Sequence, residues 1–283
     1  MKRFIGIIII LSLISVSFSG CWQVTQYSGS VTNLSEYETN PYIAVNNNVP
    51  EFTEDDITTE AYEYYSDLDW YGRCGYAMAC VGIELMPTEE RESISNVKPS
   101  GWVNNSYDFI DGKYLYNRCQ LIGFQLTGEN ANECNLITGT RYMNTEGMLP
   151  FENMVADYVK ETGNHVLYRV TPVYDGKNLV ARGVQMEAWS VEDEGAGISF
   201  NVYCYNVQPG VEIDYLTGDN WAADDWQQTP TQIVYILNVN SGKFHLSTCG
   251  QVQSISSENK QEYTGERQML IEQGYVPAGC CEP

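Results

Sequence analysis

The strongest constraint on the fold lies in residues 150–206, where one amphipathic segment is followed by three segments with the pattern of β-strands. Residues 150–162 (PFENMVADYVKET) place five apolar side chains on one face of a helix, namely Phe151, Met154, Val155, Tyr158 and Val159. Gly163 suits the position just past the end of that helix. Strands are predicted at 165–174, 179–188 and 198–206, and the turn Asp175-Gly176 favours a hairpin between the first two.

The chain of 283 residues is long enough for one large core and a small accessory module. Its 43% hydrophobic and 12% aromatic content is that of a globular protein. Composition divides it into a leader at 1–20, a Ser/Thr/Asn-rich tether at 21–50, a body at 51–221 whose first residues form an acidic, aromatic surface segment, a polar linker at 222–230 and a last unit at 231–283.

The charge balance is strongly acidic. The chain has 15 Lys and Arg against 37 Asp and Glu, a formal charge of −22. Such a surface keeps a protein soluble and repels polyanions at long range, so taken alone it argues against nucleic-acid binding. Net charge does not exclude a local cationic groove, for which the body offers Arg73, Arg91, Lys98, Lys113, Arg118 and Arg141.

The N-terminus has the pattern of an export signal. Lys2 and Arg3 precede an apolar run at 4–18, and small residues follow it before Cys21. The run is too short for a comfortable membrane span. The end of this leader resembles a bacterial lipobox, which implies acylation of Cys21 and a lipid anchor on the outer face of the cytoplasmic membrane. Simple cleavage and secretion is the alternative.

An exported chain meets an oxidising compartment, where cysteines can pair. The body contains an odd number of them, so at least one is free or pairs outside it. We expect disulfides for most of the body's cysteines, which are Cys74, Cys80, Cys119, Cys134 and Cys204.

Residues 117–152 combine polar side chains with an apolar background. Asparagine fills interiors poorly, and here it recurs among Leu, Ile and Phe. Repeated asparagine in such a setting indicates capping, turns or liganding. The residue pattern alone leaves these alternatives open.

The same stretch resembles the DNA/RNA non-specific endonucleases of the ββα-metal class. Their Asp/Asn-Arg-Gly-His element is matched by residues 117–120 (NRCQ), and their Asn-X-X-Thr segment by residues 135–138 (NLIT). Asn144 follows Asn135 by nine residues, and Glu152 follows Asn144 by eight, as in that family. The similarity extends to 72–77 (GRCGYA), 95–102 (SNVKPSGW) and 165–206, and covers most of residues 40–221.

This resemblance implies an α+β fold with a central antiparallel sheet and a set of site residues. Asn144 would ligate Mg²⁺, a hard ion for which one amide oxygen plus waters suffices. Glu152 would hold a metal-bound water, Asn135 would orient the site, and Arg118 would clamp phosphate oxygens. The implied substrate is DNA or RNA, cleaved with little sequence preference because recognition goes through the backbone.

Gln120 departs from the family pattern, since it stands where the catalytic histidine is expected. Histidine accepts the proton of the attacking water, and such general-base catalysis contributes about 10²–10⁴-fold. A glutamine amide does not hold a proton at neutral pH. His165 matches a position where relatives also carry histidine, and we expect it to be structural. Cys119 stands where many relatives have glycine.

Three hypotheses remain open at this point. The chain is a slow nuclease that uses another base, or an inactive nuclease fold that binds nucleic acid or a protein partner without cutting. The third is a surface lipoprotein that has kept only the fold. Binding of duplex DNA without turnover separates the second from the first, and the absence of both favours the third.

Residues 231–283 resemble the small zinc-binding unit of bacterial alkyl-DNA repair proteins, whose ligands are His-x₃-Cys and Cys-x₂-Cys. His245 and Cys249 match the first pair and Cys281 matches the last ligand, whereas Ala278 stands at the third. The resemblance implies a Zn²⁺ site with a structural or accessory role. A disulfide from Cys249 to Cys280 or Cys281 is the alternative.

Overall fold

The computed structural model describes residues 36–224, 233–247, 249–265, 267–279 and 281. The expected leader, the acylation site Cys21, most of the expected linker and Cys280 lie outside these residues. None of the described helices combines the length and the apolar character that a membrane crossing requires.

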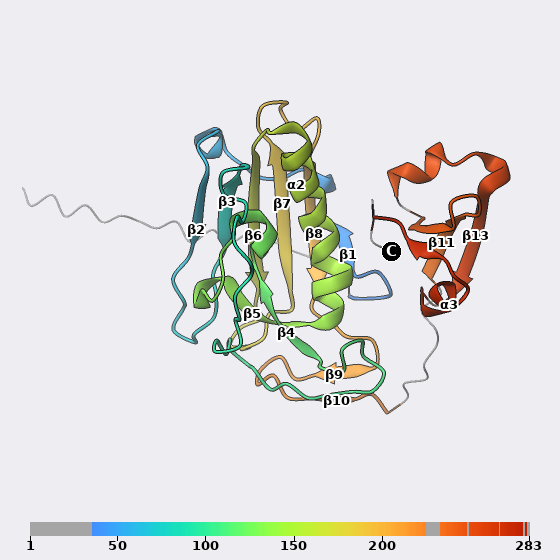
Figure 1. Ribbon diagram of the computed structural model, residues 1–283. Coiled ribbons are helices and arrows are strands. Elements are labelled where there is room, and N and C mark those ends of the chain that lie inside the picture. Colours follow the sequence, from blue (N-terminus) through green and yellow to red (C-terminus); the bar gives the residue numbers. More distant parts are fainter. Residues whose placement is uncertain (1–35, 225–232, 248, 266, 280, 282–283) are drawn as a thin grey trace, which may run out of the picture. The chain divides into compact units, whose positions relative to one another are not determined.

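The body is built on a six-stranded antiparallel sheet of order β1-β8-β7-β6-β3-β2 (Figure 1). Its strands are β1 (Tyr42–Ala44), β2 (Tyr62–Tyr65), β3 (Ala77–Val81), β6 (Val166–Val173), β7 (Gly183–Ser190) and β8 (Ser199–Tyr205). Nearly every residue of β3, β6, β7 and β8 is buried, so this is a sheet covered on both faces.

One helix, α2 (Leu149–Thr162), lies along a face of the sheet (Figure 1). Its buried residues Phe151, Val155 and Val159 join the central strands in one apolar core, and Tyr158 packs against that core. The prediction was wrong for Met154, which is 47% exposed. The helix ends at Gly163, whose φ of 73° lets its N–H reach the Val159 carbonyl. The predicted α+β fold, with a helix over residues 150–162 against an antiparallel sheet, is thereby confirmed.

A second, two-stranded pair carries the polar stretch. β4 (Tyr116–Gln120) runs antiparallel to β5 (Leu136–Thr140). Between them lie α1 (Phe124–Thr127) and the short helix η3 (Glu133–Asn135). After β5 the chain enters a π-helical turn, η4 (Met143–Met148), which continues directly into α2. The remaining elements of the body are η1 (Asn46–Asn48), η2 (Glu54–Asp56), β9 (Val211–Ile213) and β10 (Asn220–Ala222).

The C-terminal residues form a separate four-stranded sheet of order β13-β11-β12-β14. Its strands are β11 (Ile233–Asn238), β12 (Lys243–Leu246), β13 (Lys260–Gly265) and β14 (Val276–Pro277), and its helices are η5 (Gly250–Ser254), η6 (Ser257–Asn259) and α3 (Arg267–Glu272). Tyr235, Leu237, Phe244 and Leu270 are buried in its own small core.

Two boundaries differ from the sequence prediction. The strand expected at 179–188 begins at Gly183, because the N–H groups of Leu179 and Val180 bond instead to the carbonyls of Leu216 and Tyr215. Residues 42–44 were expected in the tether, yet they pair with β8 as an edge strand. The expected lead-in therefore ends before residue 42.

The expectation of disulfides for most of the body's cysteines is wrong. None of the five cysteines of the body, Cys74, Cys80, Cys119, Cys134 and Cys204, forms a disulfide. The buried sulfurs lie in separate environments: the Cys74 thiol donates to the Glu133 carbonyl at 3.2 Å, and the Cys80 thiol donates to the Thr58 carbonyl at 3.2 Å. These cysteines act as small apolar side chains with a weak donor.

Gly139 allows β5 to approach the side chains around it. A Cβ at this position would collide with Cys119 Sγ and lie 2.7 Å from Met143 Cε. We predict that Gly139→Ala lowers the free energy of unfolding by about 1–3 kcal/mol, since a packed core has no room for the methyl group. Urea denaturation of the single and double variants measures this. Cys119→Ala should recover part of the loss in the double variant, and strictly additive effects would contradict the assigned contact.

Candidate active site and metal centre

A cleft of about 860 Å³ opens beside the β4–β5 pair. Segment 91–95, β4, the start of α1 and the η4–α2 junction form its walls. The residues relevant to chemistry among those lining it are Arg91, Ser95, Asn117, Arg118, Gln120, Gly123, Arg141, Asn144 and Glu152. The structure therefore brings together four of the five residues expected in the nuclease site, Arg118, Gln120, Asn144 and Glu152.

Gln120 is held at both ends of its amide. Its Oε1 accepts a hydrogen bond from Arg91 at 2.8 Å and another from the backbone N–H of Phe124 at 3.2 Å. Its Nε2 donates to the Glu129 carbonyl at 2.7 Å. With only 6% of its surface exposed, the side chain is fixed in the cleft wall. No atom of this amide accepts a proton at neutral pH.

Asn135 is the expected site residue that does not line the cleft. It is fully buried, and its amide pairs with both backbone groups of Ile122 at 2.9 and 3.0 Å. Its own carbonyl accepts the N–H of Leu121 at 2.8 Å. Asn135 thus fixes the backbone just after Gln120, and any influence on chemistry passes through that backbone.

Arg118 supports the loop that forms one wall of the cleft. Its Nε donates to the Val97 carbonyl, and a terminal nitrogen donates to the Ser95 carbonyl at 2.8 Å. The guanidinium also lies 4.4 Å from the centre of the Trp102 ring, as in a cation–π contact. Part of the donor fork of Arg118 is therefore used to hold segment 95–97.

Asn144 and Glu152 reach the cleft from the π-helical turn and from α2. Glu152 lies against Gly123, where a Cβ would be only 2.6 Å from Glu152 Oε2. Burial raises the pKa of Glu152 to about 7, against the opposing effects of Arg91 and a hydrogen bond from Gln125. The carboxyl group is therefore balanced between its two protonation states at neutral pH, and a cation beside it would favour the charged form.

The cationic residues divide into two groups. Arg91, Arg118 and Arg141 line the cleft, as a local groove requires, although Arg141 is also paired with Asp111 at 2.7 Å. Outside the cleft, Arg73 is paired with Asp69 at 2.7 Å, and Lys113 lies 3.4 Å from Asp108. Within the described residues, Asn117 Nδ2 and Arg141 Nε are buried donors without a hydrogen-bond partner, and both belong to residues of the cleft. The sequence analysis placed Asn117 in the motif at 117–120 without giving it a role, and it did not predict the direct contact between Arg91 and Gln120.

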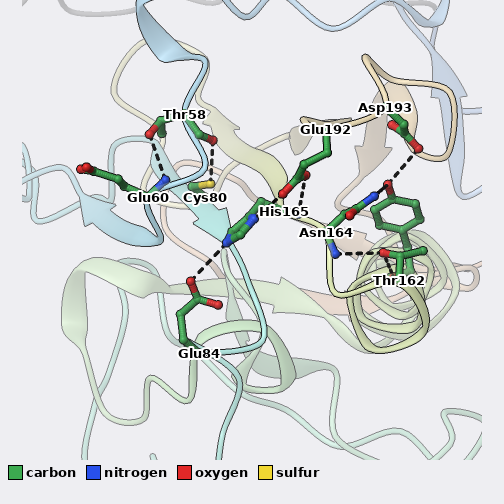
Figure 2. A network of polar contacts seen from close by, with 10 residues as sticks. Thr58, Glu60, Cys80, Glu84, Thr162, Asn164, His165, Glu192 and Asp193 are labelled. Carbon is green, nitrogen blue, oxygen red and sulfur yellow. Dashed lines mark hydrogen bonds and ion pairs between the residues drawn. The ribbon is translucent and has the colours of Figure 1, made fainter.

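His165 lies outside the cleft, between two carboxylates (Figure 2). Its Nδ1 is 2.6 Å from Glu192 Oε1 and its Nε2 is 3.1 Å from Glu84 Oε1. Burial lowers the pKa of His165, but the two carboxylates outweigh this effect and raise the pKa overall. The arrangement ties the start of β6 to two loops, as expected of a structural histidine.

The C-terminal unit gathers His245, Cys249 and Cys281, whose ligand atoms all lie within 4.8 Å of one another. Cys281 Sγ is 4.0 Å from His245 Nδ1. Burial and the nearby Lys243 lower the pKa of His245, which favours the neutral imidazole that binds metals. Ala278, at the expected position of the third ligand, is 1% exposed and supplies no side-chain donor. One nitrogen and two sulfur donors suit Zn²⁺.

Comparisons with known proteins identify the family and the fold of the body. A family model described as DNA/RNA non-specific endonuclease matches residues 52–192. The magnesium-bound NucA structure from Streptococcus agalactiae is 27% identical, with a TM-score of 0.59 over 68% of this chain and 91% of that one. The structure of Sda1 nuclease with bound zinc is 27% identical, with a TM-score of 0.57 over 65% of this chain and 97% of that one.

The pKa shifts around His165 predict how this cluster contributes to stability. A raised histidine pKa stabilises the fold below the ordinary value of 6.5 and loses effect as pH rises through the raised value. The pKa values of Glu84 and Glu192 are lowered, so their contribution is present above 4.5 and lost as pH falls. The cluster should therefore stabilise the fold most between pH 4.5 and pH 6.5.

We predict that His165→Gln loses less stability than the unmodified protein when the pH is raised from about 6 to about 8. Urea denaturation at each pH measures this difference. Glu84→Gln and Glu192→Gln are the matched variants, and each should weaken the same pH dependence. An unchanged pH dependence in His165→Gln would exclude the assigned titration.

Proposed function

Because residues 52–192 of this chain belong to the DNA/RNA non-specific endonuclease family, we propose that the cleft binds DNA or RNA and hydrolyses its phosphodiester bonds slowly, with Gln120 at the position of the missing base. The observation that carries this proposal is the gathering of Arg118, Gln120, Asn144 and Glu152 in one cleft. The leader at 1–20 supports export, with Cys21 as lipid anchor or the chain secreted.

Substrate binding follows from local rather than net charge. Three arginines line the cleft although the chain carries a formal charge of −22. The buried donors Asn117 Nδ2 and Arg141 Nε, on two residues of the cleft, make no hydrogen bond to the described protein, which costs free energy. A small movement of the cleft wall would let a phosphate oxygen accept from them. Contacts of this kind read the backbone and not the base, which accounts for low sequence preference.

The residues of the cleft fit a magnesium ion. The Asn144 side-chain carbonyl and the Glu152 carboxylate are hard oxygen donors that line the same cleft. We assign Asn144 as the direct ligand and Glu152 as the residue that orients the ion's water. When bound, the ion would neutralise charge on the phosphate and assist the leaving oxygen. Magnesium is bound in the related NucA structure.

The step that limits the reaction is removal of the proton from the attacking water. As the new oxygen–phosphorus bond forms and the bond to the leaving oxygen breaks, that proton needs an acceptor. Gln120 does not provide one, and its amide oxygen already accepts from Arg91. Two carboxylates line the cleft, Glu92 and Glu152, and we assign the proton to Glu152, which is the buried one and lies against Gly123.

The second candidate function is binding without cleavage. The observation that favours it is the complete hydrogen bonding of Gln120, which fills the place of a catalytic group with a structural one. In this case the cationic wall still binds nucleic acid, or the surface binds a protein partner. The two functions share one scaffold. They differ in whether a residue of the cleft accepts the proton of the attacking water.

We predict that Gln120→His accelerates magnesium-dependent nicking of supercoiled plasmid by about 10²–10⁴-fold. The neighbouring Arg91 should keep the new imidazole neutral and so able to accept a proton. Tyr114→His is the matched control, because Tyr114 lines the same cleft, is 59% exposed and stands at no catalytic position. Asn144→Ala should abolish the gained activity. Equal cutting by the unmodified protein and Gln120→His would contradict the assigned role of Gln120.

We also propose that residues 231–283 form a zinc-binding module, joined to a nuclease domain at 51–221 by the linker 222–230. The support is the His245, Cys249 and Cys281 cluster, with three ligand atoms close enough for one ion. Ala278 leaves the fourth position to another donor or to water. A structural role for this module follows from its small core, which a metal crosslink would stabilise.

The module should hold about one zinc ion per chain after dialysis, measured by elemental analysis of the full chain. His245→Ala and Cys249→Ser should each remove most of it. Cys134→Ser, at a half-buried cysteine of the body, is the control and should not. Asn144→Ala tests whether any zinc resides in the cleft. Retention of zinc by both module variants would exclude the proposed site.

A further inference from the structure

Trp70 is unusually exposed for a large aromatic side chain. It is 96% exposed, whereas no other large hydrophobic residue in the described part of the chain exceeds 59%. Scattered exposed apolar residues are common, but a tryptophan with almost no contact leaves a large ring surface in water. Such a surface becomes favourable once a flat partner covers it.

The turn that carries Trp70 is rigidly held. Asp69 Oδ1 accepts the backbone N–H of Tyr71 at 2.8 Å and that of Arg73 at 3.0 Å. Arg73 also donates to Asp69 Oδ2 at 2.7 Å, and its guanidinium stacks 4.5 Å from the ring centre of Tyr174. The backbone under Trp70 is therefore fixed while the ring projects into solvent, an arrangement that lowers the entropic cost of binding.

A second hollow of about 530 Å³ lies beside this turn. Leu68 and Gly72, which flank Trp70 in sequence, line it together with segments 96–99 and 131–133. Segment 96–99 continues directly from segment 91–95 of the active-site cleft. Arg118, a cleft residue, holds the carbonyls of Ser95 and Val97 on this shared wall. The hollow is thus the next space along the wall from the cleft, with a volume suited to a small ligand.

The charges of the hollow select the part of a nucleotide that enters it. Lys98 lies on the wall shared with the cleft, where it can pair with a phosphate. Glu133 lines the same hollow and repels a second phosphate. The amides of Asn96 and Asn132 offer donors and acceptors to a neutral base. A base in the hollow and a phosphate toward Lys98 satisfy all of these groups.

We propose that this hollow is a subsite for an unpaired nucleotide flanking the cleaved bond. The Trp70 ring does not line the hollow, but it stands on the turn between Leu68 and Gly72, which do, and in the proposal it stacks on the base from the solvent side. The inference rests on the proposed nucleic-acid binding of the cleft and adds a preference for single-stranded segments. A base inside a duplex has both faces covered and is not available for stacking. Every base has a flat face, so Trp70 binds without sequence preference.

The test measures how tightly the mature full chain binds a fluorescein-labelled oligothymidylate of about 12 nucleotides. Fluorescence anisotropy reports the binding, and EDTA is present so that nothing is cleaved. A duplex of the same length is titrated in parallel. Trp70→Ala should weaken binding of the single strand by about tenfold or more and change duplex binding by less than about twofold. Trp70→Phe should retain most of the affinity.

Two further variants separate stacking from charge. Trp221→Ala removes another exposed tryptophan, at 49% exposure on β10, and should change neither titration. Lys98→Ala should reduce the salt dependence of binding, whereas Trp70→Ala should leave that dependence unchanged, since stacking releases no counterions.

The outcomes distinguish the subsite from the proposed function. If the unmodified chain binds oligonucleotide and Trp70→Ala binds equally well, the subsite is excluded and the proposed function stands. If Trp70→Ala weakens single strand and duplex alike, an unpaired base is not the ligand and the inference fails. If the unmodified chain binds neither form, the proposed function fails and takes the subsite with it.

Discussion

The buried amide of Asn135 is the interaction on which the geometry of the cleft depends. It pairs with both backbone groups of Ile122, so the chain directly after Gln120 is locked to the segment that opens β5. A fully buried amide is costly unless all its hydrogen bonds are made, and here they are made to the backbone. The loop between the strands cannot shift without breaking them. Gln120 therefore keeps its position relative to Asn144 and Glu152, which lie on the two elements that follow β5.

Those groups follow within one continuous stretch of chain. β5 runs into the π-helical turn that carries Asn144, and the turn runs into α2, which carries Glu152. A π-helical turn is rare and frequently found at functional sites. The close contact of Gly139 with Cys119 sets the spacing of β4 and β5 at the base of this unit. Residues 117–152 thus form one rigid frame, and α2 anchors that frame to the large sheet through the central core.

Much of the fold and of the cleft could be predicted from the sequence, because the local sequence pattern favours the same elements that tertiary packing stabilises. The amphipathic spacing before Gly163 predicted α2, and the resemblance predicted that Gln120, Asn144 and Glu152 belong to one site. The contact of Arg91 with Gln120 joins residues 29 positions apart and leaves no local pattern. The buried role of Asn135 could not be predicted either. An asparagine that binds a metal and one that hydrogen-bonds to the backbone cannot be told apart in the sequence. The late start of β7 depends on hydrogen bonds from Leu179 and Val180 to a loop that is distant in sequence. Whether two cysteines of the body form a disulfide depends on where the fold places each sulfur, and the sequence does not show this.

The same frame would let substrate binding and catalysis be separated in the function that we propose. Arg118 holds the cleft wall through the carbonyls of segment 95–97, and Asn135 holds the end of β4 through Ile122, so neither depends on the chemistry of residue 120. In the function that we propose, Gln120 stands where a histidine would accept a proton, and its amide fills that space with hydrogen bonds to three neighbours. The proposed exchange would therefore cost the fold little and proton transfer much. On this proposal the cleft keeps its substrate surface without the base, and the side chain at position 120 decides whether a bound phosphodiester is cut.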